Sequence, residues 1–157
     1  MNHKDLVTLL KENDLTVSHQ RLSILDYLSD SEEHPTCEMI YTGLKNSGHS
    51  TLSRATVYNN IKAFVNAGIV HELEIGDHER RYDMDTEEHS HFFCRNCGEI
   101  VNLELDHKVQ TDLQDNLEAK APGYVVERKS VNFTGLCPTC YKAQENAREH
   151  DKTKFRN

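Results

Sequence analysis

The chain lacks any long run of apolar residues. Its first residues, Met1–Asp5, are largely polar, and no apolar segment as long as a signal-peptide core or a membrane span follows them. We therefore expect no signal peptide, no transmembrane helix and a cytoplasmic protein. In the reducing cytosol, paired cysteines are more often metal ligands than disulfides.

Acidic side chains are missing from one segment of an otherwise acidic protein. The formal net charge is −8 with histidine neutral, which taken alone argues against nucleic-acid binding. Between Glu38 and Glu72, however, there is no Asp or Glu, whereas Lys45, Arg54 and Lys62 lie there. A locally basic face on an acidic protein is compatible with selective DNA binding, and chance depletion is the alternative.

The first half of the chain carries strong helix signals. Apolar residues at helical spacing predict a helix over Lys4–Glu12. Three further helices are expected after capping residues, whose side-chain oxygens accept from the free amides of the first turn. These caps are Ser18, Thr36 and Ser53.

The helix that begins after Ser53 is the best delimited, because Gly68 provides its C-terminal stop. Its apolar stripe is predicted to consist of Val57, Ile61, Phe64 and Val65. Its other face offers hydrogen-bonding side chains that suit base edges and phosphates better than they suit an ordinary solvated helix. The predicted DNA-binding residues are Arg54, Thr56, Tyr58, Asn59, Asn60 and Lys62.

A hairpin is predicted after this helix. The segment Ile69–Ile75 alternates in polarity, a turn is expected at Gly76–Asp77, and Arg80–Tyr82 supplies the second strand. Helices followed by a hairpin favour a winged helix-turn-helix. A generic small helical domain that ends in a hairpin is the alternative.

The second half mixes strands and helices. The pattern predicts a strand over Ile100–Leu103, a helix over Asp106–Lys120 with Val109, Leu113 and Leu117 four apart, and a strand over Tyr124–Phe133.

Two Cys-x-x-Cys pairs flank this region and contain Cys94, Cys97, Cys137 and Cys140. Four thiolates at tetrahedral positions form a closed structural zinc site. Such a site stabilises a domain that is too small to fold by burial alone. Redox dithiols are the alternative, but the sequence lacks a thioredoxin-like pattern. Cys37 is left over and is predicted to pack on its helix, with a redox or ligand role near His34 left open.

A second group of donors is built around His89 and His91, whose rings point to the same face of a strand because they alternate with Ser90. Asp83 lies upstream, and His34 lies in the distant first half. Such mixed nitrogen and oxygen donors suit iron(II), manganese(II) or zinc, and structural or solvated histidines are the alternative. An ion bound by both halves would set their relative orientation.

Several of these motifs, in this order and spacing, resemble the ferric uptake regulator family over about residues 4–142. They are Ala-Thr-Val-Tyr-Asn-Asn at 55–60, Arg-Tyr-Asp at 81–83, His-Ser-His-Phe-Phe-Cys at 89–94, and the two Cys-x-x-Cys pairs. The first motif and His34–Pro35 are most similar to the peroxide-sensing (PerR) branch.

The resemblance implies an α+β fold. Residues 1–82 would form a winged helix-turn-helix DNA-binding domain, 83–88 a hinge, and 89–143 a small α/β dimerisation and metal-binding domain with the four-cysteine zinc site. Residues 144–157 are charged and are predicted to be a disordered tail. The resemblance further implies a homodimeric repressor that binds double-stranded DNA operators of inverted-repeat type.

The resemblance also assigns the two metal sites. Structural zinc would be bound by the four cysteines, and the regulatory iron(II) or manganese(II), with zinc as an alternative, by His34, Asp83, His89 and His91. A fifth carboxylate is expected where this chain has Asn102. An amide oxygen is a neutral ligand, which changes affinity or metal preference, and Glu104 is a substitute two residues on.

In the peroxide-sensing branch, bound iron(II) reacts with hydrogen peroxide and a ligating histidine is oxidised, here His34 or His89. Loss of that ligand releases the metal and ends repression, whereas manganese holds the DNA-binding form. An iron- or zinc-uptake regulator is the alternative within the family. However, zinc-uptake regulators often have a cysteine in their sensing site, and this chain has none near Asp83. Iron regulators usually have a glutamate at the position where this chain has Asp83.

Two alternatives come from other classes. A zinc hydrolase or deaminase needs an open zinc and a general base, and the sequence lacks a His-x-Glu paired with Pro-Cys-x-x-Cys. We therefore expect no enzyme. A protein-interaction module stabilised by zinc remains as the second alternative.

Overall fold

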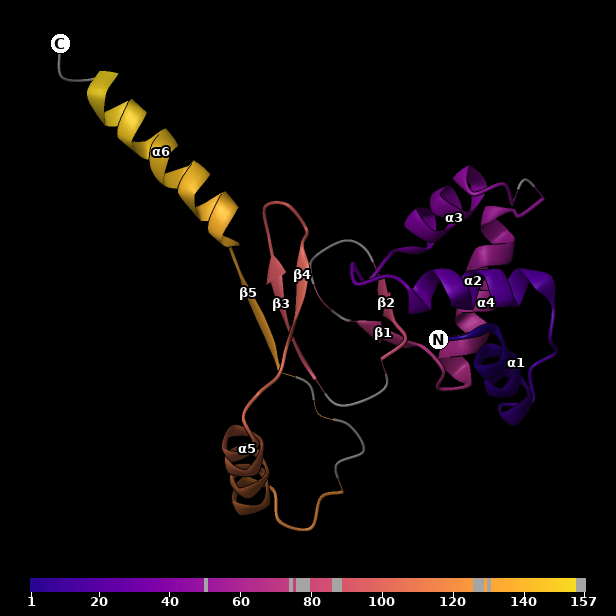
Figure 1. The fold of residues 1–157 in the computed structure, drawn as a ribbon. Coiled ribbons are helices and arrows are strands. Elements are labelled where there is room, and N and C mark those ends of the chain that lie inside the picture. Colours follow the sequence, from indigo (N-terminus) through magenta and orange to yellow (C-terminus); the bar gives the residue numbers. More distant parts are fainter. Residues whose placement is uncertain are drawn as a thin grey trace. The chain divides into compact units, whose positions relative to one another are not determined.

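The computed structural model describes residues 1–49, 51–73, 75, 80–85, 89–125, 129 and 131–154, with side chains to residue 148 (Figure 1). The chain divides into two compact units, residues 1–87 and 88–157.

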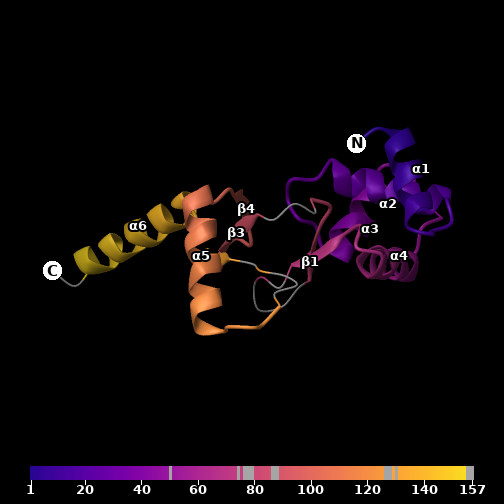
Figure 2. The same ribbon diagram turned by 90° about the horizontal axis from the view of Figure 1, so that it is seen from below.

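The first unit is built on helices α1 (His3–Glu12), α2 (His19–Ser29), α3 (Cys37–Asn46) and α4 (Arg54–Asn66). Helix α2 packs against the other three (Figures 1 and 2). The three predicted caps are confirmed, because Ser18, Thr36 and Ser53 each accept a hydrogen bond from a first-turn amide. Asn2 caps α1 in the same way.

The core of the first unit is apolar and continuous. It contains Leu6, Leu10, Ile24, Leu25, Leu28, Ile40, Leu44, Leu52, Val57, Ile61, Phe64, Ile69, Val70 and Tyr82. The stripe predicted for α4 is therefore confirmed for Val57, Ile61 and Phe64, and Val65 packs against the core while partly buried. One face of α4 is thus fixed inward, which turns the opposite face outward.

A short antiparallel hairpin follows α4. Strand β1 (His71–Leu73) pairs with β2 (Arg81–Asp83), with His71 opposite Asp83. The first strand is shorter than predicted, because the amides of Ile69 and Val70 bond to the carbonyl of Phe64 and end the helix instead. The predicted turn at Gly76–Asp77 lies outside the described residues.

The second unit contains a three-stranded sheet in the order β4-β3-β5. The central strand β3 (Ser90–Cys94) is antiparallel to β4 (Ile100–Leu103) and parallel to β5 (Asn132–Gly135). Helix α5 (His107–Lys120) lies between β4 and β5 in sequence, as predicted. Helix α6 (Pro138–Lys154) follows β5 and extends away from the sheet (Figures 1 and 2).

The predicted strand Tyr124–Phe133 is wrong in its extent. Tyr124 and Val125 are not in a strand and are highly exposed, and residues 126–128 and 130 lie outside the described part. Strand β5 pairs with β3 only from Asn132 opposite His91 to Gly135 opposite Cys94. The length of β3 thus limits β5, and this long-range constraint is invisible to local propensity.

The tail also differs from its prediction. Residues 144–157 were expected to be disordered, but residues 144–154 continue helix α6 as far as Lys154, and residues 155–157 lie outside the described part. Pro138 suits the first helical position, and the Ala, Gln, Glu and Arg residues that follow are good helix formers. The low hydrophobicity of this segment therefore did not predict its structure correctly, because its helix propensity alone favours a helix.

Candidate metal centres and DNA-binding surface

Four thiols converge at one end of the sheet in the second unit. Cys94 is the last residue of β3, Cys97 follows in a turn, Cys137 follows β5, and Cys140 lies in the first turn of α6. Their sulfur atoms all lie within 4.8 Å of one another. Parallel pairing of β3 and β5 produces this convergence, because both strands end at the same edge.

The spacing of the sulfur atoms fits one tetrahedral ion. The Sγ atoms of Cys97 and Cys137 are 3.8 Å apart, and zinc–sulfur bonds of about 2.3 Å place two tetrahedral thiolates about 3.8 Å apart. All the cysteines are free thiols. The four side chains thus fit a structural zinc ion and leave no coordination position for a substrate.

Backbone amides prepare one of these thiols for metal binding. Desolvation opposes ionisation of Cys94, but the N–H groups of Cys137, Cys97 and Asn96 donate to its sulfur and lower its pKa to about 6. The amide of Cys137 lies 3.2 Å from that sulfur. A thiolate is the form that binds metal, so this cluster favours the ligating state.

The side chain of Asn96 contacts the cysteine cluster, which the sequence did not indicate. Its Nδ2 atom donates to the sulfur of Cys140 at 3.2 Å and lowers the pKa of that thiol, although neighbouring thiols and burial raise it overall. Only the position of Asn96 inside the first Cys-x-x-Cys pair hinted at this role. A ligand held by a second hydrogen-bonded group is oriented more firmly.

The first unit assembles one pair of candidate regulatory ligands. The Nε2 atom of His34 lies 3.3 Å from Oδ2 of Asp83 on β2, and both side chains have little solvent exposure. Two contacts bring β2 to this loop: the amide of Tyr82 donates to the carbonyl of Pro35, and Arg81 donates to that of His34. His34 has a φ of +48°, a left-handed conformation that is costly for a residue with a Cβ and that is concentrated at functional sites.

The second unit assembles the other pair. The rings of His89 and His91 have centroids 4.5 Å apart with an interplanar angle of 61°, so the two imidazoles are neighbours as the alternation predicted. His91 is on the central strand and is buried. Asn102 on β4 lies opposite His91, and Glu104 follows the end of β4; both side chains are exposed. Asn132 on β5 also lies opposite His91, and no local signal pointed to this amide.

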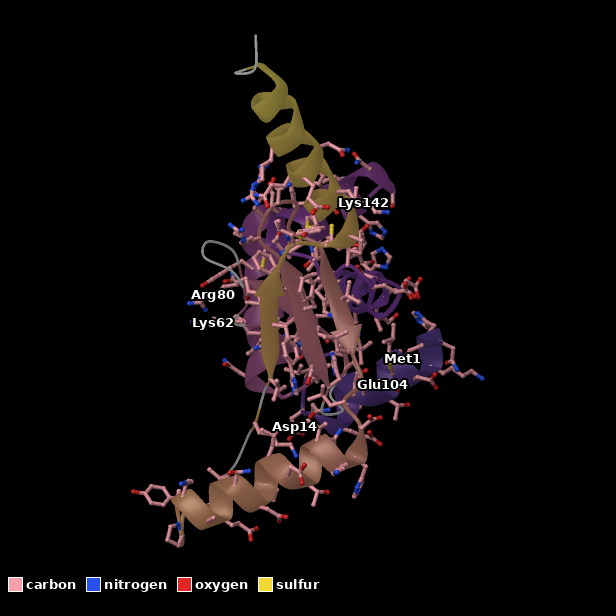
Figure 3. All side chains as sticks on the ribbon, turned by 90° about the vertical axis from the view of Figure 1, so that its left-hand side faces the viewer. Met1, Asp14, Lys62, Arg80, Glu104 and Lys142 are labelled. Carbon is pink, nitrogen blue, oxygen red and sulfur yellow. The ribbon has the colours of Figure 1, made fainter. Side chains whose placement is uncertain are left out.

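The outward face of α4 presents most of the predicted DNA-binding side chains. Arg54, Tyr58, Asn59 and Lys62 are exposed. Lys62 and the wing residue Arg80 project from the same side of the first unit (Figure 3), where together with Tyr58 they line a hollow of about 220 Å³. Glu72 also lines this hollow and pairs with Arg80 at 2.9 Å, so the hollow combines two cations with one carboxylate.

Two of the predicted DNA-binding side chains are partly buried and engaged within the protein. The hydroxyl of Thr56 lies 2.8 Å from that of the capping residue Ser53. Asn60 accepts a hydrogen bond from Arg21 of α2 and donates to the carbonyl of Thr56. Asn60 therefore connects α4 to α2 and Thr56 contacts the cap of its own helix, whereas Arg54, Tyr58, Asn59 and Lys62 are exposed.

Cys37 lies outside these clusters. Cys37 is the first residue of helix α3, and its thiol is half-buried. Burial raises the pKa of this thiol, and the hydroxyl of Tyr82 is its hydrogen-bond partner. It is therefore packed as the sequence suggested. In the described part of the chain, no helix is long and apolar enough to cross a membrane.

Helices that end in a two-stranded wing, followed by a small sheet domain with four converging thiols, define the class of zinc-stabilised winged-helix transcription regulators. The model of the ferric uptake regulator family matches residues 12–132, and the chain belongs to this family. The predicted family and the α+β fold class are confirmed.

Individual relatives agree with this assignment. The chain is 36% identical over 143 residues to the peroxide operon regulator of Bacillus subtilis (strain 168), covering 91% of this chain and 96% of the relative. The Vibrio cholerae ferric uptake regulator has a similar structure, with a TM-score of 0.72 and 30% identity over 83% of this chain and 98% of that chain. The Campylobacter jejuni peroxide stress regulator matches with a TM-score of 0.67 and 32% identity over 86% and 98%.

The family consists of metal-dependent transcription regulators. The chain is accordingly a metal-dependent repressor with a structural zinc site and donors suited to a regulatory metal. The family is one of transcription regulators and not of enzymes.

Proposed function

We propose that this chain is a cytoplasmic, non-enzymatic repressor of the peroxide-responsive type, which binds inverted-repeat DNA operators as a homodimer. The observation that carries the proposal is the similarity to peroxide regulators in both sequence and structure, at 36% and 32% identity. The Vibrio cholerae relative, at 30%, keeps iron-uptake regulation as the second candidate.

The regulatory metal would be bound by His34, Asp83, His89 and His91. The first unit already pairs His34 with Asp83, and the second unit already pairs His89 with His91. Three imidazole nitrogens and a carboxylate oxygen suit iron(II) or manganese(II), and zinc would also be accepted. Because each unit contributes two donors, the bound state would fix the orientation of α4 of each protomer, the reading helix, relative to the dimerisation domain.

When bound, iron(II) would supply the reactivity towards hydrogen peroxide. The role of the chain is to position an imidazole, His34 or His89, where it becomes the oxidised group. The loss of one donor nitrogen would leave one unit with fewer ligands. The metal would then link the two units less strongly, and the reading helices would lose their fixed orientation.

Homodimerisation is supported by the apolar surface of the second unit. Val109 and Leu113 on α5 are 43% and 42% exposed, and no residue of α5 is buried in the protomer. Val101 and Phe133 on the sheet are similarly exposed. An amphipathic helix whose apolar stripe lacks cover in the monomer is expected to bury it against a second copy.

The decisive experiment measures operator affinity with iron(II), manganese(II) and zinc in turn, before and after hydrogen peroxide. We expect peroxide to abolish binding by the iron form and to leave the manganese form unchanged. A response to zinc alone, or one indifferent to peroxide, would contradict the proposal. His91→Ala should remove the response, and His107→Ala, which changes an exposed histidine on α5, is the matched control.

A further inference from the structure

The first residue of the reading helix is held by a carboxylate from the neighbouring helix. Arg54 donates from Nε to Oε2 of Glu38 and from Nη2 to Oε1, both at 2.7 Å. This is the parallel, two-point geometry in which a guanidinium recognises a carboxylate most specifically. Both side chains are exposed, so the pair lies on the protein surface rather than in the core, at the start of the helix that we propose binds DNA.

An aromatic ring completes the setting of Arg54. Its guanidinium carbon lies 4.4 Å from the centroid of Tyr41, one turn along α3 from Glu38. The ring and the carboxylate together define the plane and direction of the guanidinium. The two hydrogen bonds use Nε and Nη2, and the Nη1 edge takes no part in them.

The charge pattern around the reading helix repeats this arrangement. Glu38 and Glu72 are the two acidic residues that border the segment without Asp or Glu. Each is paired with an arginine of the DNA-facing surface, Glu38 with Arg54 and Glu72 with Arg80. Carboxylates therefore occur at the edges of this basic surface, where they contact its arginines.

A carboxylate at this position discriminates between ligands. Any DNA offers phosphates, and a phosphate must compete with Glu38 for the guanidinium while being repelled by its charge. Hydrogen bonds from Arg54 lower the pKa of Glu38, so the carboxylate is ionised at neutral pH. A correctly placed guanine edge is uncharged and can accept from an arginine that is already oriented.

We propose that Glu38 is a specificity-determining residue, whose carboxylate withholds Arg54 from phosphates of non-cognate DNA and presents it for base contact at the operator. The inference rests on the proposed DNA binding. It assigns a role in selectivity to a residue of α3, outside the reading helix itself.

The test uses the full-length, manganese-loaded protein and the substitution Glu38→Gln, which preserves shape and removes one charge. The two probes are the duplex that the wild-type protein enriches from a randomised pool and a random-sequence duplex of equal length. We expect affinity for the random duplex to rise about fivefold in 0.1 M salt. The affinity for the random duplex should also fall more steeply with salt, by a slope that corresponds to about two more released counterions per dimer, one for each released arginine.

Affinity for the enriched duplex should change by less than about twofold, so the selectivity ratio falls. The gain should vanish in the double variant Glu38→Gln, Arg54→Gln, because the released guanidinium is then absent. Glu12→Gln removes an equal charge from the last turn of α1 and is the matched control. Zinc content and the thermal midpoint report whether the variants are folded.

A selectivity ratio and salt slope equal to those of the wild type would overturn the inference. So would a parallel rise for both duplexes, which the loss of bulk charge explains, or a parallel fall, which a purely structural role explains. If the wild-type protein enriches no duplex, DNA binding itself fails and the inference fails with it. That outcome is distinct because it is seen before any variant is made.

Discussion

At the scale of one residue, His34 has a backbone conformation that lowers the stability of the fold at a candidate metal centre. A left-handed backbone conformation costs about 1–3 kcal/mol for a residue with a Cβ. His34 adopts it at φ +48° while its ring pairs with Asp83. A glycine would relieve the strain but would supply no imidazole, so the conformation is consistent with the proposed role of His34 as a ligand.

Substitution of His34 therefore separates ligation from folding. His34→Ala should lower manganese affinity at least about tenfold, as expected for loss of one ligand of four, and leave zinc content unchanged. Titration calorimetry and metal analysis would measure both. Unchanged manganese affinity would place the regulatory site elsewhere. His107→Ala serves as the control.

Asn102 offers a second test at this scale. It lies opposite His91 on the neighbouring strand, so Asn102→Asp would add a negative oxygen donor beside that ring and should tighten manganese binding about tenfold. Glu104→Gln should have no effect, because Glu104 follows the end of β4. Loss of affinity in Glu104→Gln would instead identify Glu104 as the ligand.

At the scale of the elements, the helix caps could be predicted from local sequence, whereas long-range strand pairing could not. The caps Ser18, Thr36 and Ser53 were predictable because each contacts an amide within its own first turn. The limits of β5 were not, because pairing with β3 across the sheet sets them. Asn96 and Asn132 escaped notice for the same reason: their partners lie on other segments.

The cap of the reading helix should carry measurable stability. Ser53→Ala removes the hydrogen bond to the amide of Thr56 and should lower the free energy of unfolding by about 1 kcal/mol. Chemical denaturation would measure this. Ser29→Ala, at the last residue of α2, should change stability by less than about 0.5 kcal/mol. Equal effects of the two substitutions would contradict the role of Ser53 as a cap.

At the scale of the whole molecule, the two units are stabilised by different means. The continuous apolar core, from Leu6 to Tyr82, belongs entirely to the first unit. In the described part of the second unit, the buried apolar side chains are only Cys94, Ile100 and Cys137. Two of these three belong to the four-cysteine cluster that fits a structural zinc ion, and such an ion would compensate for the small core of this unit.

Removal of zinc should consequently affect the units unequally. With a strong chelator, we expect the second unit to lose its cooperative thermal transition and the first unit to keep its own. Hydrogen exchange followed by mass spectrometry would locate the loss. Protection lost equally in both units would show that the first unit also depends on the metal.

Strand β3 carries a donor of each candidate metal centre, since His91 and Cys94 are three positions apart on a single strand. Under the proposed function, we therefore expect oxidation of the cysteine cluster to displace His91 and to weaken binding of the regulatory metal, although no histidine is modified.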